Sequence, residues 1–586
     1  MNLKENAQNK FSRSAFSLLS LTIIILHLGA CHSIKKSDSA PQQVQQQVEV
    51  VKIAQSSPGT VTQSIPNMED VTIKGIVTAE GKGLEGVVVS DGYEVTITNA
   101  DGEYFLASEK KNGYVFISVP GNYEVTTTKN LPQFFKRLGG GSVVEQKDFA
   151  LTKTDNTQHV VLALADWHLA NRNNDLEQFR EDFLPDLNAT IATYKAKGVK
   201  VYGLTLGDLA WDSYWYKNNF ALPEYLKELN KVNCPIFNVI GNHDNDPYAE
   251  GDWDAALPFK NIVSPNYYSF NLGNIHYVVL DNVEYINTGA SEGKAGKGNY
   301  NGVIVDAQME WLKKDLATIT DKNTPIVIAM HIPLFSFPRL DDEGEQTHKV
   351  RLENGDKLLS LLQDFEQVRL LTGHTHVNFT VEDTPSITEH NIAAVCATWW
   401  WTGKKGYAGN HICKDGSPGG YSVWENDGNK MEWYYKSMGY DKDYQFRVYD
   451  LNTIHMTAEK YAPKSTEQAF SKYTDVYGTP NSNNEVLINV WGYDNEWKIE
   501  VTENGEPLEV ERVSIKDPLH IVSYEALRLN VGSNPTSSFV SNYTNHMFKT
   551  KASSATSTLL IKVTDRFGNV YTEAMNRPKA FGYSMR

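Results

Sequence analysis

The sequence is short of cysteine, has no surplus of positive charge and shows no internal repeat, and each shortage excludes a class of protein. Only 4 of its 586 residues are cysteines and no CxxC pair occurs, which excludes zinc-ribbon and thioredoxin-like proteins. Acidic residues outnumber basic residues by 71 to 55, and the formal net charge of −16 argues against nucleic acid as a partner. The absence of a repeat with a period of about 20–50 residues argues against a solenoid.

Long apolar runs are also scarce, and the one that stands out lies near the N-terminus and predicts export. Basic residues precede the apolar segment 15–28, whose length suits a signal peptide better than a permanent membrane span. Leu28-Gly29-Ala30-Cys31 follows, and small residues directly before a cysteine resemble a bacterial lipobox. The resemblance implies that residues 1–31 are a lipoprotein signal peptide and that Cys31 carries the lipid; an ordinary signal peptide cut near Ala30 is the alternative. We therefore expect a lipoprotein of the cell envelope that faces the periplasm or the exterior and touches the membrane only through its lipid anchor.

Changes in composition after Cys31 predict a tether and three folded domains. Residues 32–70 are rich in Ser, Gln, Pro and Lys, as is typical of a flexible polar tether. Residues 71–150 consist of short alternating strands between turn signals and resemble the carboxypeptidase-regulatory, transthyretin-like β-sandwiches. Residues 151–450 alternate apolar strands with amphipathic helices and end in a segment dense in Trp, Tyr and Gly, which predicts an α/β domain with an aromatic-rich extension. Residues 451–586 return to short strands and predict a second β-sandwich.

The expected elements of the α/β domain can be placed by their hydrophobic patterns. Apolar runs bounded by turns predict buried strands, and apolar positions at helical spacing predict helices that cover a sheet. Strands are expected at 160–165, 201–206, 236–240, 277–280, 326–330 and 368–371. Helices are expected near 175–196, 223–231, 306–316 and 356–365.

Five short motifs follow directly after five of these strands. In chain order they are Asp166-Trp167-His168, Gly207-Asp208, Gly241-Asn242-His243-Asp244, His331 and Gly373-His374-Thr375-His376. Ligand sites in open α/β sheets gather at the carboxyl ends of the strands, so the positions of these motifs are as informative as their letters. The first two motifs and the single His331 are weak signals alone, the four residues from Gly241 are more specific, and histidines two residues apart after a strand indicate a metal site.

The motifs in this order resemble the calcineurin-like metallophosphoesterases, whose signature is DxH, GD, GNH[DE], H and GHxH. All five blocks are intact within residues 157–380. The resemblance implies a metallophosphoesterase β-sheet sandwich with flanking helices and a metal-dependent phosphoric ester hydrolase. The small β domain before it and the β domain after it also resemble a bacterial subgroup of this family.

The resemblance also implies which residues hold two divalent metal ions, with Mn, Zn and Fe as the candidates. Two such ions about 3.5–4 Å apart lower the pKa of a bound water, so that a metal-bound hydroxide attacks the phosphate ester. Asp208 would bridge the two metals. The remaining ligands would be Asp166, His168 and His376 at the first metal and Asn242, His331 and His374 at the second. Purple acid phosphatases have a Tyr ligand at the position of Trp211, so no tyrosinate–iron absorption band is expected.

His243 is the residue of its motif that does not bind metal in this family, and the resemblance makes it a general acid. A carboxylate that hydrogen-bonds its ring would keep it cationic. Asp246, three residues later, and Asp244, the next residue, are rival candidates for this role, and a loop-capping Asp246 is the alternative.

Several aromatic residues are candidates for substrate binding. Aromatic faces with lysines nearby suit a sugar, a nucleobase or a lipid headgroup. The candidates are Trp399, Trp400, Trp401 and Trp211, with Arg172 as the candidate that binds the phosphate. The competing interpretation is a structural seam between the catalytic domain and the C-terminal sandwich. A disulfide between Cys396 and Cys413 also stays open in an oxidising compartment.

The function expected from the sequence is hydrolysis of a small phosphorylated substrate in the cell envelope. Nucleotides, sugar phosphates, glycerophosphodiesters and phosphorylated glycans are all compatible, and the sequence does not choose between monoesters and diesters. The alternative is a glycan-binding envelope lipoprotein with a non-catalytic phosphoesterase scaffold, in which the β-sandwiches and the Trp cluster bind the glycan.

Overall fold

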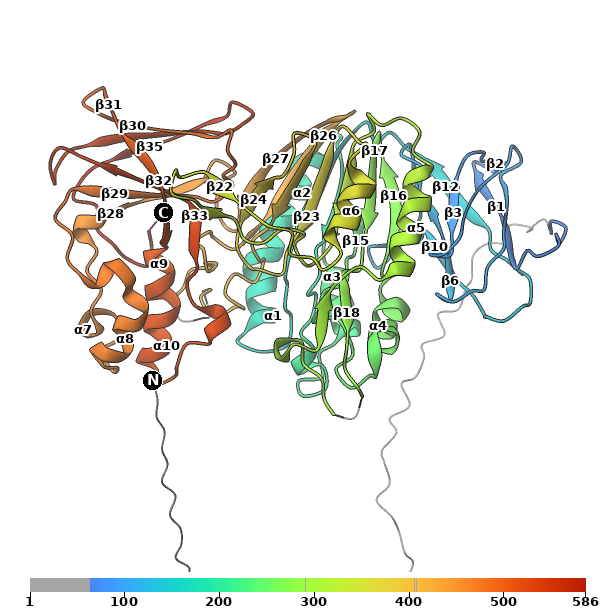
Figure 1. Cartoon of the computed structure of the whole chain (residues 1–586), viewed down its shortest axis with the longest axis horizontal. Helices are drawn as coiled ribbons and strands as arrows, with labels where there is room; N and C mark the ends of the chain where they lie inside the picture. The colour runs from blue at the N-terminus through green and yellow to red at the C-terminus, as the bar shows by residue number, and fades with distance from the viewer. Residues whose placement is uncertain (1–63, 290, 405, 407, 586) are drawn as a thin grey trace, which may run out of the picture. The chain divides into compact units, whose positions relative to one another are not determined.

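The computed structural model describes residues 64–289, 291–404, 406 and 408–585 (Figure 1). The predicted signal peptide, the lipidation site Cys31 and most of the predicted tether lie outside the described residues. Among the described residues, no helix is both long and apolar enough to span a bilayer. The large sheets form three pairs along the chain, and the middle pair carries the five motifs.

The first sheet of the middle pair has the strand order β15-β14-β13-β26-β27. Its strands are β13 (Gln158–Leu164), β14 (Lys200–Thr205), β15 (Ile236–Phe237), β26 (Gly420–Asp427) and β27 (Lys430–Ser437). β13, β14 and β15 are parallel, whereas β26 pairs antiparallel with β13. The predicted aromatic-rich extension therefore returns to the catalytic sheet and completes it.

The second sheet of this pair has the order β16-β17-β20-β23-β25-β24. Its strands are β16 (Tyr268–Leu272), β17 (Ile275–Val279), β20 (Ile326–Ala329), β23 (Val368–Thr372), β24 (Phe379–Glu382) and β25 (Ile387–Asn391). β17, β20, β23 and β25 are parallel, and antiparallel strands close both edges. Three two-stranded ribbons accompany the large sheets: β8 (Thr127–Thr128) with β9 (Leu131–Pro132), β18 (Val283–Tyr285) with β19 (Tyr300–Gly302), and β21 (Arg339–Leu340) with β22 (Gln346–Thr347).

Strand β13 shows why the two sheets stack. Successive side chains of a strand point to opposite faces, and both faces of β13 are apolar. Val161 and Ala163 join the core cluster that also contains residues of the second sheet, whereas Leu162 and Leu164 join the cluster beneath the helices. A strand of this kind is stable only with a layer on each side, which produces the predicted α/β sandwich.

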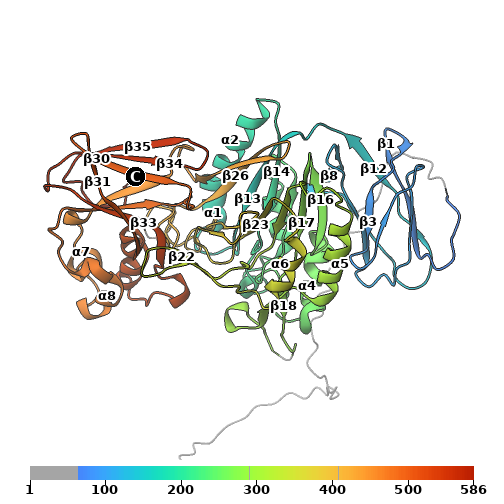
Figure 2. The same ribbon diagram turned by 45° about the horizontal axis from the view of Figure 1, so that its top comes forward.

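Helices cover the outer faces of the two sheets. They are α1 (Asp175–Gln178), continued by η1 (Phe179–Phe183) and α2 (Leu184–Lys195), then α3 (Leu222–Leu229), α4 (Gly251–Ile262), α5 (Asp306–Ala317) and α6 (Gly355–Leu362). α5 and α6 lie against the sheet that contains β16 and β17 in both views (Figures 1 and 2). All four helices expected in this domain form close to their predicted bounds. The pattern did not predict α4, which contains Pro258, a residue that usually ends a helix.

The N-terminal domain consists of two facing sheets. One contains β1 (Ile73–Ala79), β2 (Lys82–Gly83), β5 (Glu103–Leu106), β7 (Tyr123–Glu124), β11 (Glu145–Gln146) and β12 (Phe149–Lys153). The other contains β3 (Val88–Ser90), β4 (Val95–Ile97), β6 (Tyr114–Ser118) and β10 (Phe135–Arg137). The fold is the all-β arrangement that the alternating pattern predicts.

The C-terminal domain contains two four-stranded antiparallel sheets and an added helical layer that the sequence did not predict (Figure 2). The sheets consist of β28 (Phe446–Asp450), β29 (Glu485–Val490), β32 (Val510–Lys516) and β33 (Tyr543–Lys551), and of β30 (Lys498–Glu503), β31 (Glu506–Leu508), β34 (Leu559–Thr564) and β35 (Val570–Met575). The helices are α7 (Ala458–Tyr461), α8 (Glu467–Thr474), α9 (Pro518–Ile521) and, after the π-helical η6 (Val522–Ala526), α10 (Leu527–Asn530). Because β28 pairs with β29, the C-terminal sheet begins before residue 451.

Candidate metal centre

The seven predicted ligands lie on loops that follow five parallel strands. Strands β13, β14 and β15 of the first sheet precede three of the motifs, and β20 and β23 of the second sheet precede the other two. Parallel strands present their carboxyl ends at one edge of a sheet, so the stacked sheets bring all five loops together.

The backbone is strained where the ligands lie. Positive φ angles, which are uncommon for residues other than glycine, occur at five of them: Asp166 (53°), His168 (43°), Asp208 (52°), His374 (68°) and His376 (59°). Gly207 also has a positive φ, and a Cβ there would come within 2.5 Å of Nδ1 of His331. Strain of this kind concentrates at functional sites because the surrounding structure must enforce it.

One group of ligand atoms forms around Asp166. Its Oδ1 lies 3.3 Å from Nε2 of His376 and 3.7 Å from Nε2 of His168, and these two nitrogens are 2.9 Å apart. All three side chains are almost completely buried. Oδ1 of Asp166 accepts no hydrogen bond from any residue that the structure describes.

A second group forms around His331, and Asp208 joins the two groups. Nε2 of His331 lies 2.9 Å from Oδ1 of Asn242 and 3.1 Å from Nδ1 of His374. Oδ2 of Asp208 lies 3.2 Å from Nε2 of His331 and 3.4 Å from Nε2 of His168. One carboxylate oxygen therefore faces both groups, as a bridging ligand must.

Backbone groups orient several of these side chains. Nδ1 of His331 lies 2.7 Å from the carbonyl oxygen of Leu206, and Nδ1 of His376 lies 3.2 Å from that of Ala397. A donor proton on Nδ1 leaves the lone pair of Nε2 available to a metal, and hydrogen bonds of this kind are usual in metal-binding histidines. Burial lowers the pKa of His374 well below its usual value, and the charge of His331 adds to this effect.

The ring of His243 is paired with Asp212, not with either predicted carboxylate. Nδ1 of His243 donates to Oδ1 of Asp212 over 2.7 Å, and the backbone N–H of His243 donates to Asp208. Burial alone would lower the pKa of His243, but the charges of Asp212 and Asp208 raise it to about 9. Sequence analysis missed this partner, although Asp212 lies only four residues after Asp208 in the same loop.

The two carboxylates predicted for this role have other partners. Asp244 is fully buried and accepts backbone N–H bonds from Leu209, Ala210 and Gly241, so it holds two loops together. Asp246 accepts the hydroxyl hydrogen of Tyr216 over 2.9 Å and the backbone N–H of Tyr248 over 3.0 Å. In this structure neither carboxylate contacts the imidazole.

The three consecutive tryptophans have three different environments. Trp399 is 8% exposed and stacks between His376, with ring centroids 3.8 Å apart, and Phe539 of the C-terminal domain, at 3.7 Å. Trp400 is 1% exposed and donates to the carbonyl oxygen of Trp167, so its predicted role at the substrate rim does not fit its buried position. Trp401 is half-buried near the guanidinium groups of Arg172 and Arg528.

Trp211 and Arg172, both predicted to bind substrate, lie beside the predicted ligands. The Trp211 ring lies 5.3 Å from the His168 ring and 5.7 Å from the His243 ring. The Arg172 guanidinium lies 4.7 Å from the Trp211 ring and 4.8 Å from the Tyr214 ring. The aromatic rings therefore hold a cation beside the ligand set.

Cys396 and Cys413 are free and buried in the structure, so the open possibility of a disulfide is not realised. Sγ of Cys396 lies 3.7 Å from Nδ1 of His376, whereas Nε2 of the same ring faces Asp166 and His168. Burial raises the pKa of both thiols well above the usual value.

The fold and the ligand set define a metal-dependent phosphoric ester hydrolase. The profile of the calcineurin-like phosphoesterase domain matches residues 159–378, the profile of its N-terminal region matches residues 71–154, and the profile of its C-terminal region matches residues 389–571. The chain belongs to the calcineurin-like phosphoesterase family, which depends on a dinuclear metal centre.

Two curated plant proteins from Arabidopsis thaliana are similar to this chain. A manganese-dependent ADP-ribose/CDP-alcohol diphosphatase is 23% identical over 36% of this chain and 75% of its own length. Purple acid phosphatase 15 is 29% identical over 28% of this chain, and the match spans only 27% of that relative. Among solved structures, a dimetal phosphatase from Danio rerio matches 48% of this chain and 96% of its own, with 14% identity and a TM-score of 0.34.

Proposed function

We propose that the seven converging residues bind two divalent metals and that the chain hydrolyses small phosphate esters in the cell envelope. The observation that carries the proposal is the position of Asp208, whose Oδ2 faces ligand groups from both sheets. Asp166, His168 and His376 complete one site, and Asn242, His331 and His374 complete the other. Oδ1 of Asp166 is buried and accepts no hydrogen bond from a described residue, and Nε2 of His168 faces Nε2 of His376 at 2.9 Å. A metal ion would satisfy these buried polar atoms better than they satisfy one another.

Bound there, the metals would supply positive charge for the phosphate oxygens and a water of lowered pKa. The protein's own contribution is to hold the phosphate and to handle the proton of the leaving group. Asp212 keeps the proton of His243 on Nδ1 and favours the charged ring, so that Nε2 can donate to the leaving oxygen. The half-buried Trp211 packs near the imidazole and limits the access of water.

The substrate class follows from the rim. Arg172, held over Trp211 and Tyr214, adds a cation beside the ligand set and favours an anionic substrate. The similar plant diphosphatase is named for ADP-ribose and CDP-alcohols, which are small phosphorylated molecules. We place nucleotides, sugar phosphates and glycerophosphodiesters in the class to be tested and leave both monoesters and diesters within it.

The test uses the full chain, purified in detergent, chelated, and then reloaded with Mn²⁺ or Zn²⁺. We expect chelation to abolish turnover of nitrophenyl phosphate or bis-nitrophenyl phosphate and the metals to restore it. His243→Ala should lower kcat by about 10²–10⁴-fold while the protein still binds metal. Asp212→Asn should lower kcat clearly more than its matched control Asp246→Asn. No metal-dependent turnover of any phosphate ester would overturn the proposal.

The proposed location has a separate test. If Cys31 carries the lipid, the wild-type chain should sediment with membranes, and Cys31→Ser should move it to the soluble fraction. Activity per molecule should not change, because the folded domains stay the same. A wild-type chain that is soluble, or a Cys31→Ser variant that stays with the membranes, would contradict the lipid anchor.

A further inference from the structure

A cavity of about 500 Å³ lies beside the metal centre and outside the ligand set. Its walls include Asp212, Tyr214, Tyr216, Lys217, Tyr248 and Lys294. Cavities of this size hold small molecules in many proteins, and aromatic walls with a few polar groups are typical of them. The wall residues come from the loops after β14 and β15 and from the segment between β18 and β19.

Asp212 lines the cavity and also contacts His243, the residue that we propose as the general acid. Its Oδ1 accepts the hydrogen bond from His243, and its Oδ2 accepts the backbone N–H of Ala295 over 3.1 Å. A single side chain therefore separates the cavity from the imidazole that we assign to the leaving group. The cavity therefore borders the Asp212–His243 pair, and the organic substituent of a phosphate held at the ligand set would extend from this pair.

The most exposed aromatic side chains near the site lie here, since Trp211 and Trp401 are half-buried. Tyr216 is 55% exposed and Tyr248 is 50% exposed, whereas Trp399 and Trp400 are buried. The two tyrosine rings meet edge to face, with centroids 4.9 Å apart and planes at 71°. Exposed rings of this kind have faces free to stack on a ligand.

Asp246 holds this tyrosine pair in place. Its two carboxylate oxygens accept the hydroxyl hydrogen of Tyr216, and one of them also accepts the backbone N–H of Tyr248. The rings are therefore oriented before a ligand arrives, which lowers the entropic cost of binding. This contact also gives Asp246 a role other than the predicted support of His243.

Charged groups complete the cavity with donors and acceptors. The Lys217 ammonium lies 5.7 Å from the centroid of the Tyr214 ring, and Lys294 lies 3.5 Å from Glu292. Cations and a carboxylate on the same wall suit the mixed donors and acceptors of a base edge or of sugar hydroxyls. A plain alkyl substituent would leave them without a ligand partner.

We propose that this cavity is a substrate subsite that binds the ring of the phosphate ester's organic substituent, a nucleobase or a sugar, against Tyr216 and Tyr248. The inference rests on the proposed phosphoesterase function, because that function places the phosphate at the neighbouring ligand set. It identifies the substrates as ring-bearing phosphate esters and moves the predicted aromatic subsite away from Trp400.

The experiment compares AMP and glucose 6-phosphate, which carry rings, with glycerol 3-phosphate, which does not. The Mn²⁺-loaded full chain is used, and affinity is taken as KM for an ester that is turned over and as a calorimetric Kd for one that is not. We expect at least one ring-bearing ester to bind about tenfold or more tightly than glycerol 3-phosphate, as base–aromatic stacking contributes in other sites. The ester with the larger advantage identifies the ring as a base or a sugar.

Variants of Tyr216 and Tyr248 test whether the ring of the substrate binds at this cavity. The double variant Tyr216→Ala/Tyr248→Ala should abolish the advantage of the ring and leave glycerol 3-phosphate within about twofold of wild type, because stacking requires the aromatic faces. The matched variant Tyr216→Phe/Tyr248→Phe keeps both rings and should keep the advantage. Tyr543→Ala removes a tyrosine of similar exposure, 51%, from the C-terminal domain and should change neither affinity.

The outcomes separate this inference from the function on which it rests. Equal affinity for all three esters in the wild type, or an advantage that survives in the double alanine variant, overturns the subsite. Metal-dependent turnover of other esters would still support the phosphoesterase function in that case. Absence of all turnover overturns the function, while the calorimetric comparison still decides whether the cavity binds rings.

Discussion

The two accessory domains are both β-sandwiches, but they contact the catalytic domain in different ways. The N-terminal domain covers an edge of the second sheet, where Val119 pairs with Phe270 of β16. The hydroxyl of Tyr114 donates to Oδ1 of Asn266, which lies two residues before the same strand, over 3.1 Å. These contacts protect an exposed strand edge, which is a common need of open sheets.

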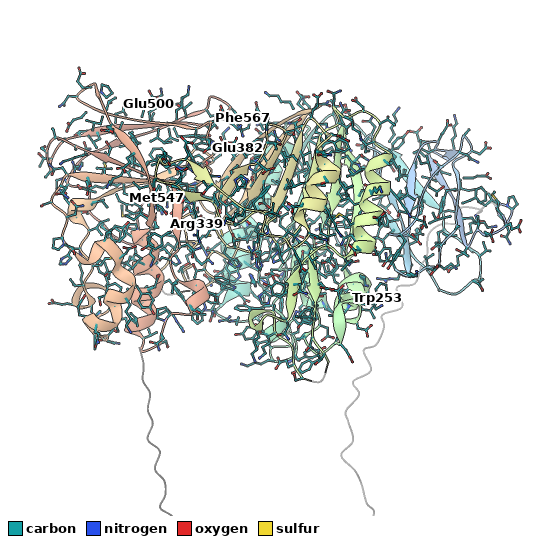
Figure 3. The ribbon with its side chains drawn as sticks, in the orientation of Figure 1. Trp253, Arg339, Glu382, Glu500, Met547 and Phe567 are labelled. Atoms are coloured by element: carbon teal, nitrogen blue, oxygen red, sulfur yellow. The ribbon has the colours of Figure 1, made fainter. Side chains whose placement is uncertain are left out.

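The C-terminal domain instead contacts the loop that packs against the predicted metal ligand His376. Phe539 stacks on Trp399, which stacks on His376, and we call these three rings the ring stack. Nε2 of His520 lies 2.9 Å from Oγ1 of Thr398 in the same loop. Further contacts, such as the salt bridge between Arg566 and Glu382 and the packing of Phe567 on Trp433, lie away from the ligands (Figure 3 labels Glu382 and Phe567).

The two accessory β-sandwiches therefore contribute unequally to the candidate metal centre, although their folds are similar. Ala397, Trp399 and Trp400 all have positive φ angles, so the loop beside His376 is strained and needs support. The C-terminal domain provides this support, whereas the N-terminal domain contacts neither this loop nor the ligands in the described residues. We therefore predict that changes at the C-terminal interface affect metal binding, whereas changes at the N-terminal interface affect stability alone.

The largest expected effect comes from the ring stack. Phe539→Ala removes the ring that presses Trp399 against His376, so the orientation of this ligand is less restricted. We expect metal affinity to fall by about 10–100-fold, the range for groups that orient a metal ligand. A metal titration by calorimetry measures this loss independently of turnover.

Phe567→Ala is the matched control for the ring stack. It removes another aromatic contact between the same two domains, because the Phe567 ring meets Trp433 with centroids 4.9 Å apart. Metal affinity should stay within about twofold of wild type, since no ligand contacts this pair. Equal losses in the two variants would mean that the C-terminal domain acts only through general stability.

A smaller effect is expected at the N-terminal interface. Tyr114→Phe removes one buried hydrogen bond to Asn266 and should lower the free energy of unfolding by about 1 kcal/mol. Urea unfolding measures this change. Metal affinity and kcat should not change, and a loss of either would show that this domain also influences the metal centre.

The smallest expected effect is a pH dependence within the N-terminal domain. Burial raises the pKa of Glu145, but the ammonium groups of Lys110 and Lys147 and the N–H of Gly139 lower it to about 2. A carboxylate with a lowered pKa in the folded state stabilises the protein above its usual pKa of about 4.5 and loses this contribution as the pH falls towards 2. Glu145→Gln should therefore reduce the difference in unfolding midpoint between pH 6 and pH 3. An unchanged difference would show that Glu145 does not contribute to it.

The sequence predicted the class of fold and the family because strand ends are local features. Each ligand motif directly follows an apolar strand, so its place at the edge of a sheet follows from chain order alone. The seven ligands did come together, although the assignment of each to a metal is still a prediction. Helices α1–α2, α3, α5 and α6 were predictable for the same reason, since their apolar positions recur at helical spacing.

Other features depend on residues distant in sequence and were missed. The partner of His243 is Asp212, which lies on another loop and is indistinguishable in sequence from any exposed aspartate. The unequal environments of Trp399 and Trp400 depend on Phe539, more than a hundred residues later. The helices of the C-terminal domain are short, and short amphipathic segments give a weak periodic signal.

By itself, the sequence determined the alternation of strands and helices, the ligand types and the family. The physical reason is that hydrophobic periodicity and the chemistry of single residues are local properties of the chain. Only the tertiary structure decided that Asp208 faces ligands from both sheets, that Asp212 supports His243, and that the C-terminal domain reaches His376. These contacts join residues from different elements, and their geometry exists only after the sheets and domains have packed.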